Sequence, residues 1–229
     1  MFNWFIKHDT FETSHFFEGF TDYHSHILPG VDDGVRSMQQ AIAILEEYER
    51  LGIREVWCTP HVMEDIQNST SNLKARFAEL QESYTGSVKL FLAAEYMMDS
   101  VFEVRLKSRD ILTLGLEGNQ VLVETSYFGP PAHFMQTLQE IKSKGYLPVL
   151  AHPERYMYMP DASYYKNLKQ LGIQFQLNVG SFTGTYGRAA KAKAEMLLKG
   201  GYYDYKGTDI HNIRLLHSIL KTDLPKALR

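Results

Sequence analysis

Short apolar runs alternate with amphipathic segments along most of the chain. Seven runs have the length and composition of β-strands, and the fifth is apolar throughout, as in a strand buried on both faces. The expected strands span residues 20–24, 54–59, 88–96, 120–126, 146–151, 173–179 and 202–208. Strands that alternate with helices predict a parallel α/β fold. Short connections in a domain of about 200–250 residues favour a barrel over an open sheet.

Helices are expected between these strands. Ser37 and Gln40 have the spacing of a capping box, and the apolar positions that follow repeat at helical spacing until Gly52. Further helices are predicted around residues 73–80 and over residues 130–145, 164–171, 188–199 and 213–220. No glycine-rich phosphate-binding motif follows the first strand, where the chain reads Tyr-His-Ser-His over residues 23–26. The sequence therefore disfavours a dinucleotide-binding Rossmann domain.

Length and composition narrow the class of protein. The 229 residues suffice for one sizeable core, so we expect a single domain over residues 20–229, preceded by an N-terminal arm over residues 1–19. The net charge of −3 argues against a broad nucleic-acid or anionic-lipid surface. No window approaches the ~20 apolar residues of a membrane-spanning helix, and no signal peptide is evident. The single cysteine, Cys58, excludes an intramolecular disulfide and is typical of the reducing cytoplasm.

Side chains that bind metal ions stand at the ends of most predicted strands. Catalytic groups of a parallel barrel lie at the carboxyl ends of its strands, so these positions carry the functional information. The residues there are His24, His26, His61, Glu95, Glu124, His152, Asp209 and His211, with Asp33 in the first loop. Because side chains alternate along a strand, His24 and His26 are expected to point to the same face.

Each of these residues alone also has an ordinary structural interpretation. A lone His-x-His pair is often a surface or capping pair, and His61 and His152, next to prolines, are equally typical of hydrogen-bonded structural histidines. Glu95 and Glu124 end apolar runs, where a buried carboxylate needs an ionic partner or a metal. Their combination at one barrel mouth predicts a metal site, because chance does not place so many ligands at successive strand ends.

The kind and number of ligands indicate the metals and the chemistry. Imidazoles and carboxylates without a thiolate suit Mn, Fe and Zn, and more ligands are present than one ion can use. We therefore expect two or three divalent ions, with Mn favoured over Fe or Zn. Ions about 3.5–4 Å apart clamp a phosphoryl or carbonyl oxygen and an attacking hydroxide, which predicts hydrolysis.

Several motifs together give a family resemblance. Residues 22–34 read Asp-Tyr-His-Ser-His-Ile-Leu-Pro-Gly-Val-Asp-Asp-Gly, residues 151–156 read Ala-His-Pro-Glu-Arg-Tyr, and residues 207–212 read Gly-Thr-Asp-Ile-His-Asn. These motifs resemble those of the PHP (polymerase and histidinol phosphatase) superfamily. Within it, the chain is similar to the tyrosine-protein phosphatases encoded with bacterial capsule and exopolysaccharide systems. The resemblance extends over about residues 20–217.

The resemblance implies a distorted seven-stranded (β/α) TIM-like barrel of the PHP type with a trinuclear metal site. It also implies that the chain hydrolyses phosphotyrosine, on the tyrosine-rich tail of a capsule or exopolysaccharide tyrosine kinase. The ligand sets it implies are His24, His26, Glu95 and Asp209 for one ion, Glu95, Glu124 and His152 for a second, and Asp33, His61 and His211 for a third. No feature of the sequence selects an oligomeric state.

The expected mechanism is attack by a metal-bound hydroxide without a phosphoenzyme. Cys58 is followed six positions on by Glu64, so the Cys-x5-Arg pattern of cysteine phosphatases is missing. Arg155 is expected to grip the phosphate, because its planar guanidinium matches phosphate oxygens. Pairing of Arg155 with Glu154 is the alternative. Arg214 is a second candidate for contact with the phosphate.

Residues beside the ligands have expected supporting roles. Asp22 is expected to orient a ligand histidine rather than to bind metal. Asn178 ends the sixth strand and is expected to face the site. Tyr127 and Phe128 either line a slot for an aromatic leaving group or pack at the barrel rim.

Three other activities are compatible with parts of this pattern. A small-molecule phosphatase such as histidinol phosphatase shares the fold and metals of the superfamily, and it is the main alternative. A nuclease of the superfamily is disfavoured by the net charge of −3. A metal-binding module without catalysis is disfavoured because every expected ligand position is filled.

Overall fold

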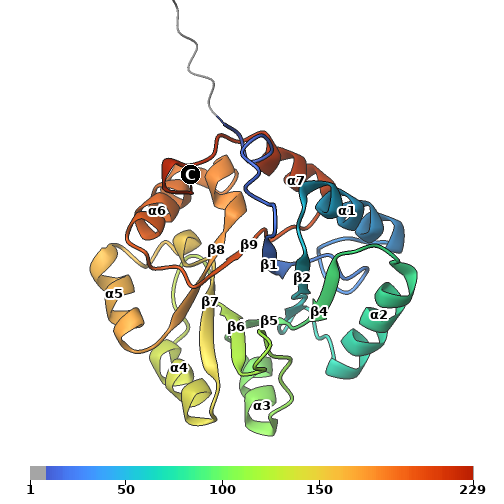
Figure 1. Ribbon diagram of the computed structural model, residues 1–229. Helices are drawn as coiled ribbons and strands as arrows, with labels where there is room; N and C mark the ends of the chain where they lie inside the picture. Colours follow the sequence, from blue (N-terminus) through green and yellow to red (C-terminus); the bar gives the residue numbers. More distant parts are fainter. Residues whose placement is uncertain (1–8, 229) are drawn as a thin grey trace, which may run out of the picture.

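Parallel strands surrounded by a ring of helices form the part of the protein that the computed structural model describes, residues 9–228 (Figure 1). The strands are β1 (Thr21–Ser25), β2 (Glu55–Cys58), β3 (His61–Val62), β4 (Lys89–Leu92), β5 (Glu95–Met97), β6 (Gln120–Glu124), β7 (Leu147–Ala151), β8 (Gln174–Asn178) and β9 (Tyr205–Gly207). The helices are α1 (Met38–Leu51), α2 (Thr70–Ser83), α3 (Ser100–Ser108), α4 (Phe134–Ser143), α5 (Ala162–Gln170), α6 (Gly187–Lys199) and α7 (Ile213–Leu220). No helix in these residues combines the length and apolarity needed to cross a membrane.

Two curled parallel sheets carry the strands of residues 9–228. Their orders are β1-β2-β4 and β3-β5-β6-β7-β8-β9, and every pairing within them is parallel. The outer strands β1 and β9 adjoin, because Ser25 and Ile210 form a parallel bridge and the Asp209 amide donates to the His24 carbonyl at 2.8 Å. The predicted parallel α/β class is confirmed, and the carboxyl ends of the strands converge on one side.

The second expected strand, residues 54–59, corresponds to β2, and the short strand β3 follows it. The third expected strand, residues 88–96, is divided into β4 and β5, so it does not form a single strand. β2 and β3 are separated by Thr59 and Pro60, and proline has no amide hydrogen to continue a ladder. Hydrogen bonds cross the break all the same, from the Ala93 amide to the Cys58 carbonyl and from the Glu95 amide to the Pro60 carbonyl. These hydrogen bonds keep the start of β5 beside the segment that joins β2 to β3.

Helix α3 was absent from the sequence expectation. Asp99 caps it by accepting from the Phe102 amide at 3.0 Å, and it ends at Arg109 in a left-handed conformation. Only Phe102 and Leu106 of this helix are fully buried, so its apolar stripe is too narrow for a clear periodic signal.

The described residues of the expected N-terminal arm, 9–19, contact the rest of the fold. Phe11 and Phe17 are buried, and the Phe11 amide donates to the Thr222 carbonyl at 3.0 Å. Thr10 forms a bridge with Asp223. Residues 1–8 of the expected arm lie outside the described residues, and the domain boundary at residue 20 stays a prediction.

A buried carboxylate, Asp22 on β1, links this strand to helix α1 and to Thr208, the residue after β9. It accepts hydrogen bonds from the Tyr48 hydroxyl of α1 at 2.6 Å, from the Thr208 hydroxyl at 2.7 Å and from the His24 amide at 3.2 Å. Burial raises the pKa of Asp22, and hydrogen bonds from Tyr48 and Thr208 oppose that rise. Asp22 thus contacts the backbone of His24, a predicted ligand, and its expected role in orienting that histidine stays a prediction.

We predict that Tyr48→Phe lowers the free energy of unfolding by about 1–3 kcal/mol, because it leaves buried Asp22 without one of its donors. Urea denaturation of the purified protein measures the change. Tyr164→Phe is the matched control, since the Tyr164 hydroxyl makes no hydrogen bond among residues 9–228. Equal stability of the two variants would contradict the role given to Asp22.

Candidate metal centre

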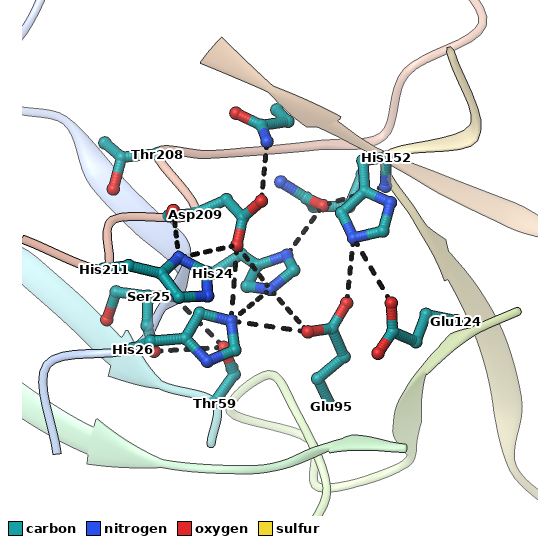
Figure 2. A network of polar contacts seen from close by, with 12 residues as sticks. His24, Ser25, His26, Thr59, Glu95, Glu124, His152, Thr208, Asp209 and His211 are labelled. Atoms are coloured by element: carbon teal, nitrogen blue, oxygen red, sulfur yellow. Dashed lines mark hydrogen bonds and ion pairs between the residues drawn. The ribbon is translucent and has the colours of Figure 1, made fainter. Parts of the chain in front are cut away.

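All nine predicted metal-binding side chains converge on one side of the fold. Figure 2 shows seven of them, without Asp33 and His61. We call these nine residues the ligand cluster: His24, His26, Asp33, His61, Glu95, Glu124, His152, Asp209 and His211. Their ligand atoms form four overlapping groups, each within 4.8 Å, namely His26-Asp33-His61-His211, His24-His26-Asp209, His24-Glu95-His152 and His61-Glu95-Glu124. The structure brings the predicted residues together, while their division among individual ions stays a prediction.

Glu95 lies at the centre of the ligand cluster. Its carboxylate is completely buried and lies 3.1 Å from His24 Nε2, 3.2 Å from His61 Nδ1 and 3.0 Å from His152 Nε2. Burial opposes ionisation of Glu95, yet the surrounding histidines, His24 first, hold its pKa well below the usual range. The histidines around Glu95 therefore favour the charged form of this carboxylate inside the fold.

A buried ring nitrogen of the ligand cluster without a hydrogen bond also supports metal binding. The buried His61 Nδ1 lies 3.2 Å from an oxygen of Glu95 and 3.2 Å from an oxygen of Glu124, yet it makes no hydrogen bond. Buried polar atoms of this kind normally have a partner. A donor set of imidazoles and carboxylates that face one another, with one buried ring nitrogen unpaired, suits divalent ions.

Two members of the ligand cluster have an unusual backbone conformation. His152, just after β7, has φ 32°, and Asp209, just after β9, has φ 52°. Few residues other than glycine adopt positive φ, and such strain gathers at functional sites. Position 207, two residues before Asp209, requires glycine, because a Cβ there would lie 2.5 Å from the Cβ of His24. This close approach lets β9 lie against β1.

Hydrogen bonds from outside the ligand cluster fix the orientation of its histidines. His24 Nδ1 lies 2.9 Å from the Gln176 side-chain oxygen, and His26 Nδ1 lies 2.9 Å from Asp32. Both contacts leave Nε2 facing the ligand cluster. The Asn178 side-chain amide donates to Asp209 at 2.7 Å, as its expected position implied.

Gln176 and Asp32 were missed by the sequence analysis. Side-chain alternation along β8 carried a usable signal, because it places Gln176 on the same face as Asn178. The contact of Asp32 depends on how the first loop folds back toward His26, and no local pattern encodes it.

Arg155 is held between two aromatic rings beside the ligand cluster. Its guanidinium carbon lies 4.4 Å from the centre of the Tyr127 ring and 4.1 Å from that of Tyr186. Its Nη1 donates to Asp209 at 2.8 Å, so it pairs with a member of the ligand cluster and not with Glu154. Glu154 instead accepts from Ser181 and from the Asn178 amide.

The space above the ligand cluster is a cavity of about 250 Å³, which we call the inner cavity. Its lining includes Tyr127, Arg155 and Tyr186 together with six members of the ligand cluster. Arg214 is exposed and lines a neighbouring cavity of about 600 Å³ that also touches Asp33 and His211. Its contact with phosphate stays a prediction.

A parallel α/β fold with several metal-binding groups at its strand ends is typical of metal-dependent hydrolases. The sequence matches the model of the family described as capsular polysaccharide synthesis, CpsB/CapC, over residues 20–219. This chain belongs to the CpsB/CapC family.

Characterised relatives share most of their length with this chain. It is 27% identical to the tyrosine-protein phosphatase YwqE of Bacillus subtilis over 198 residues, which cover 84% of this chain and 78% of YwqE. It is 26% identical to the tyrosine-protein phosphatase CpsB of Streptococcus pneumoniae over 204 residues, with 84% and 83% covered. A solved structure from work on YwqE and CpsB, described as unique metal-dependent tyrosine phosphatases, matches with a TM-score of 0.76 and 25% identity, covering 91% of this chain and 90% of that one.

We predict that Asp32→Asn weakens metal binding by about 10- to 100-fold, because the amide no longer fixes His26 with a charged acceptor. Competition titration with a chelating dye, using Mn²⁺ and separately Zn²⁺, measures the affinity. Asp65→Asn is the control, since Asp65 is exposed and outside the ligand cluster. Unchanged affinity in Asp32→Asn would exclude this orienting role.

Proposed function

We propose that this chain is a metal-dependent protein-tyrosine phosphatase. The observation that carries the proposal is the ligand cluster with Arg155 beside it, at the mouth of a cavity in a fold shared with metal-dependent tyrosine phosphatases. The relatives YwqE and CpsB bear the same activity in their names, which supports the assignment.

Arg155 binds the phosphate in this proposal. Its guanidinium presents several donors in one plane, which matches two phosphate oxygens at once. The rings of Tyr127 and Tyr186 restrict it to that plane, so little rotational freedom is lost when the substrate binds. Aromatic walls also give the inner cavity a surface that suits a phenyl leaving group.

The ligand cluster supplies the hydrolytic chemistry when it holds its ions. Divalent ions lower the pKa of water and neutralise the charge of the phosphoryl group. We assign the ligands to three ions as His24, His26, Glu95 and Asp209; Glu95, Glu124 and His152; and Asp33, His61 and His211. We keep manganese as the preferred metal, with iron and zinc as alternatives, since this donor set accepts all three.

The thiol of Cys58 has no part in this mechanism. The residue is completely buried on β2, burial raises its pKa, and it does not line the inner cavity. Cys58 is therefore not the nucleophile, in agreement with hydrolysis that forms no covalent phosphoenzyme.

The remaining parts of the proposal concern architecture and context. We interpret β2 with β3, and β4 with β5, as two interrupted strands of a distorted seven-stranded TIM-like barrel of the PHP type. The bridge between Ser25 and Ile210 supports closure of this ring. We further propose a cytoplasmic enzyme acting on the tyrosine-rich tail of a capsule or exopolysaccharide tyrosine kinase, and Arg214 as a further contact for phosphate.

We expect Mn²⁺-loaded protein to release phosphate faster from a phosphotyrosine peptide than from histidinol phosphate. Chelation and His152→Ala should both abolish turnover, because each removes ions from the ligand cluster. Cys58→Ser is the matched control and should keep full activity. Preference for histidinol phosphate would transfer the assignment to the small-molecule phosphatases.

We expect Arg155→Ala to lower kcat/KM for a phosphotyrosine peptide by about 30- to 100-fold, the loss of roughly 2–3 kcal/mol from a charge-assisted contact. Arg54→Ala is the control, since Arg54 is exposed and precedes β2, at the opposite ends of the strands. Metal content is measured in both variants. A loss below threefold with full metal loading would exclude Arg155 as a phosphate ligand.

A further inference from the structure

A second hollow adjoins the inner cavity and is not used by the chemistry described so far. It has a volume of about 560 Å³, and we call it the outer groove. Tyr127, Arg155 and Tyr186 line both spaces, so the aromatic clamp around Arg155 forms their common wall. A substrate held in the inner cavity therefore has the outer groove as its immediate neighbour.

Apolar side chains are exposed in the outer groove to an unusual degree. Phe128 is 81% exposed and Met157 is 68% exposed, although both are large hydrophobic residues. The two loops that carry them are joined, because the Met157 amide donates to the Tyr127 carbonyl at 2.8 Å. Exposed apolar side chains that gather beside an active site indicate a surface that binds a partner or substrate.

The charge of the outer groove is positive where it is accessible. Arg188 and Lys193 of α6 line it. Its one lining carboxylate, Glu154, is buried and accepts hydrogen bonds from Ser181 and Tyr203. The accessible charges of the outer groove therefore complement acidic groups and not basic ones.

We propose that the outer groove binds the peptide segment next to the phosphotyrosine and selects segments with an aromatic and an acidic side chain. The aromatic side chain lies on Phe128 and Met157, since rings and thioethers pack well together. The acidic side chain faces Arg188. The proposal rests on the proposed phosphatase function and adds the substrate class: phosphotyrosine with aromatic and acidic neighbours.

The experiment compares three substrates on Mn²⁺-loaded protein: free phosphotyrosine, a phosphotyrosine peptide with Tyr and Glu neighbours, and one with Gly and Ser neighbours. The wild type should have a lower KM for the Tyr/Glu peptide than for the Gly/Ser peptide. The double variant Phe128→Ser/Met157→Ser should raise KM for the Tyr/Glu peptide about 10-fold, since partial burial of the two side chains is lost. Its kcat/KM for free phosphotyrosine should be unchanged.

Two further variants sharpen the comparison. Arg188→Glu should raise KM for the Tyr/Glu peptide and leave the Gly/Ser peptide nearly unaffected. Leu116→Ser is the matched control, because Leu116 is 82% exposed but lies before β6, at the opposite ends of the strands.

The outcomes separate this proposal from the proposed function. Equal KM values for both peptides, or an equal loss on free phosphotyrosine in the double variant, would overturn the outer groove as a peptide site while leaving the phosphatase intact. Dimerisation lost in the double variant, with unchanged kinetics, would assign the same surface to a second copy of the chain and overturn the proposal too. A wild type inactive on all three substrates would overturn both.

Discussion

The carboxylate of Glu95 imposes the central electrostatic constraint on this protein, because it is completely buried at the first residue of β5, just beyond the carboxyl end of β4. A buried charge is tolerated only when opposite charges or metal ions surround it. Histidines on β1, at the start of β3 and just after β7 surround it, because the parallel strands bring these positions to one side of the fold. Figure 2 shows His24 and His152 beside Glu95. The same arrangement that stabilises the carboxylate assembles a metal-binding site.

Local strain and buried polar contacts hold this arrangement in place. His152 and Asp209 keep positive φ angles that cost free energy in the absence of compensating contacts. Asp22 bonds to the backbone on both sides of the β1–β9 junction, and Gly207 permits the close approach of the two strands. Asp22 and Gly207, which are not themselves predicted ligands, thus help to hold the ligand cluster in place.

The residues around the ligand cluster bind the substrate in the proposed function, whereas the ligand cluster itself supplies the chemistry. Tyr127 and Tyr186 fix Arg155 next to the inner cavity, and the same three residues border the outer groove. In the proposed function, one wall therefore orients the phosphate on its inner side and contacts the flanking peptide on its outer side. Substrate selection then depends on loops that carry Phe128 and Met157, outside the ligand cluster.

The sequence by itself determined the fold class and the composition of the site. Side-chain alternation put His24 and His26 on one face, and chain order placed the other ligand types at strand ends, so both were readable from local patterns. Only the tertiary structure decided which of these side chains meet, that the expected strand 88–96 is divided into β4 and β5, and that Arg155 pairs with Asp209. The contact of Asp32 with His26 likewise could not be predicted from a local pattern. Contacts between loops distant in sequence depend on how the two curled sheets bring their strand ends together, and no short segment of the chain contains that arrangement.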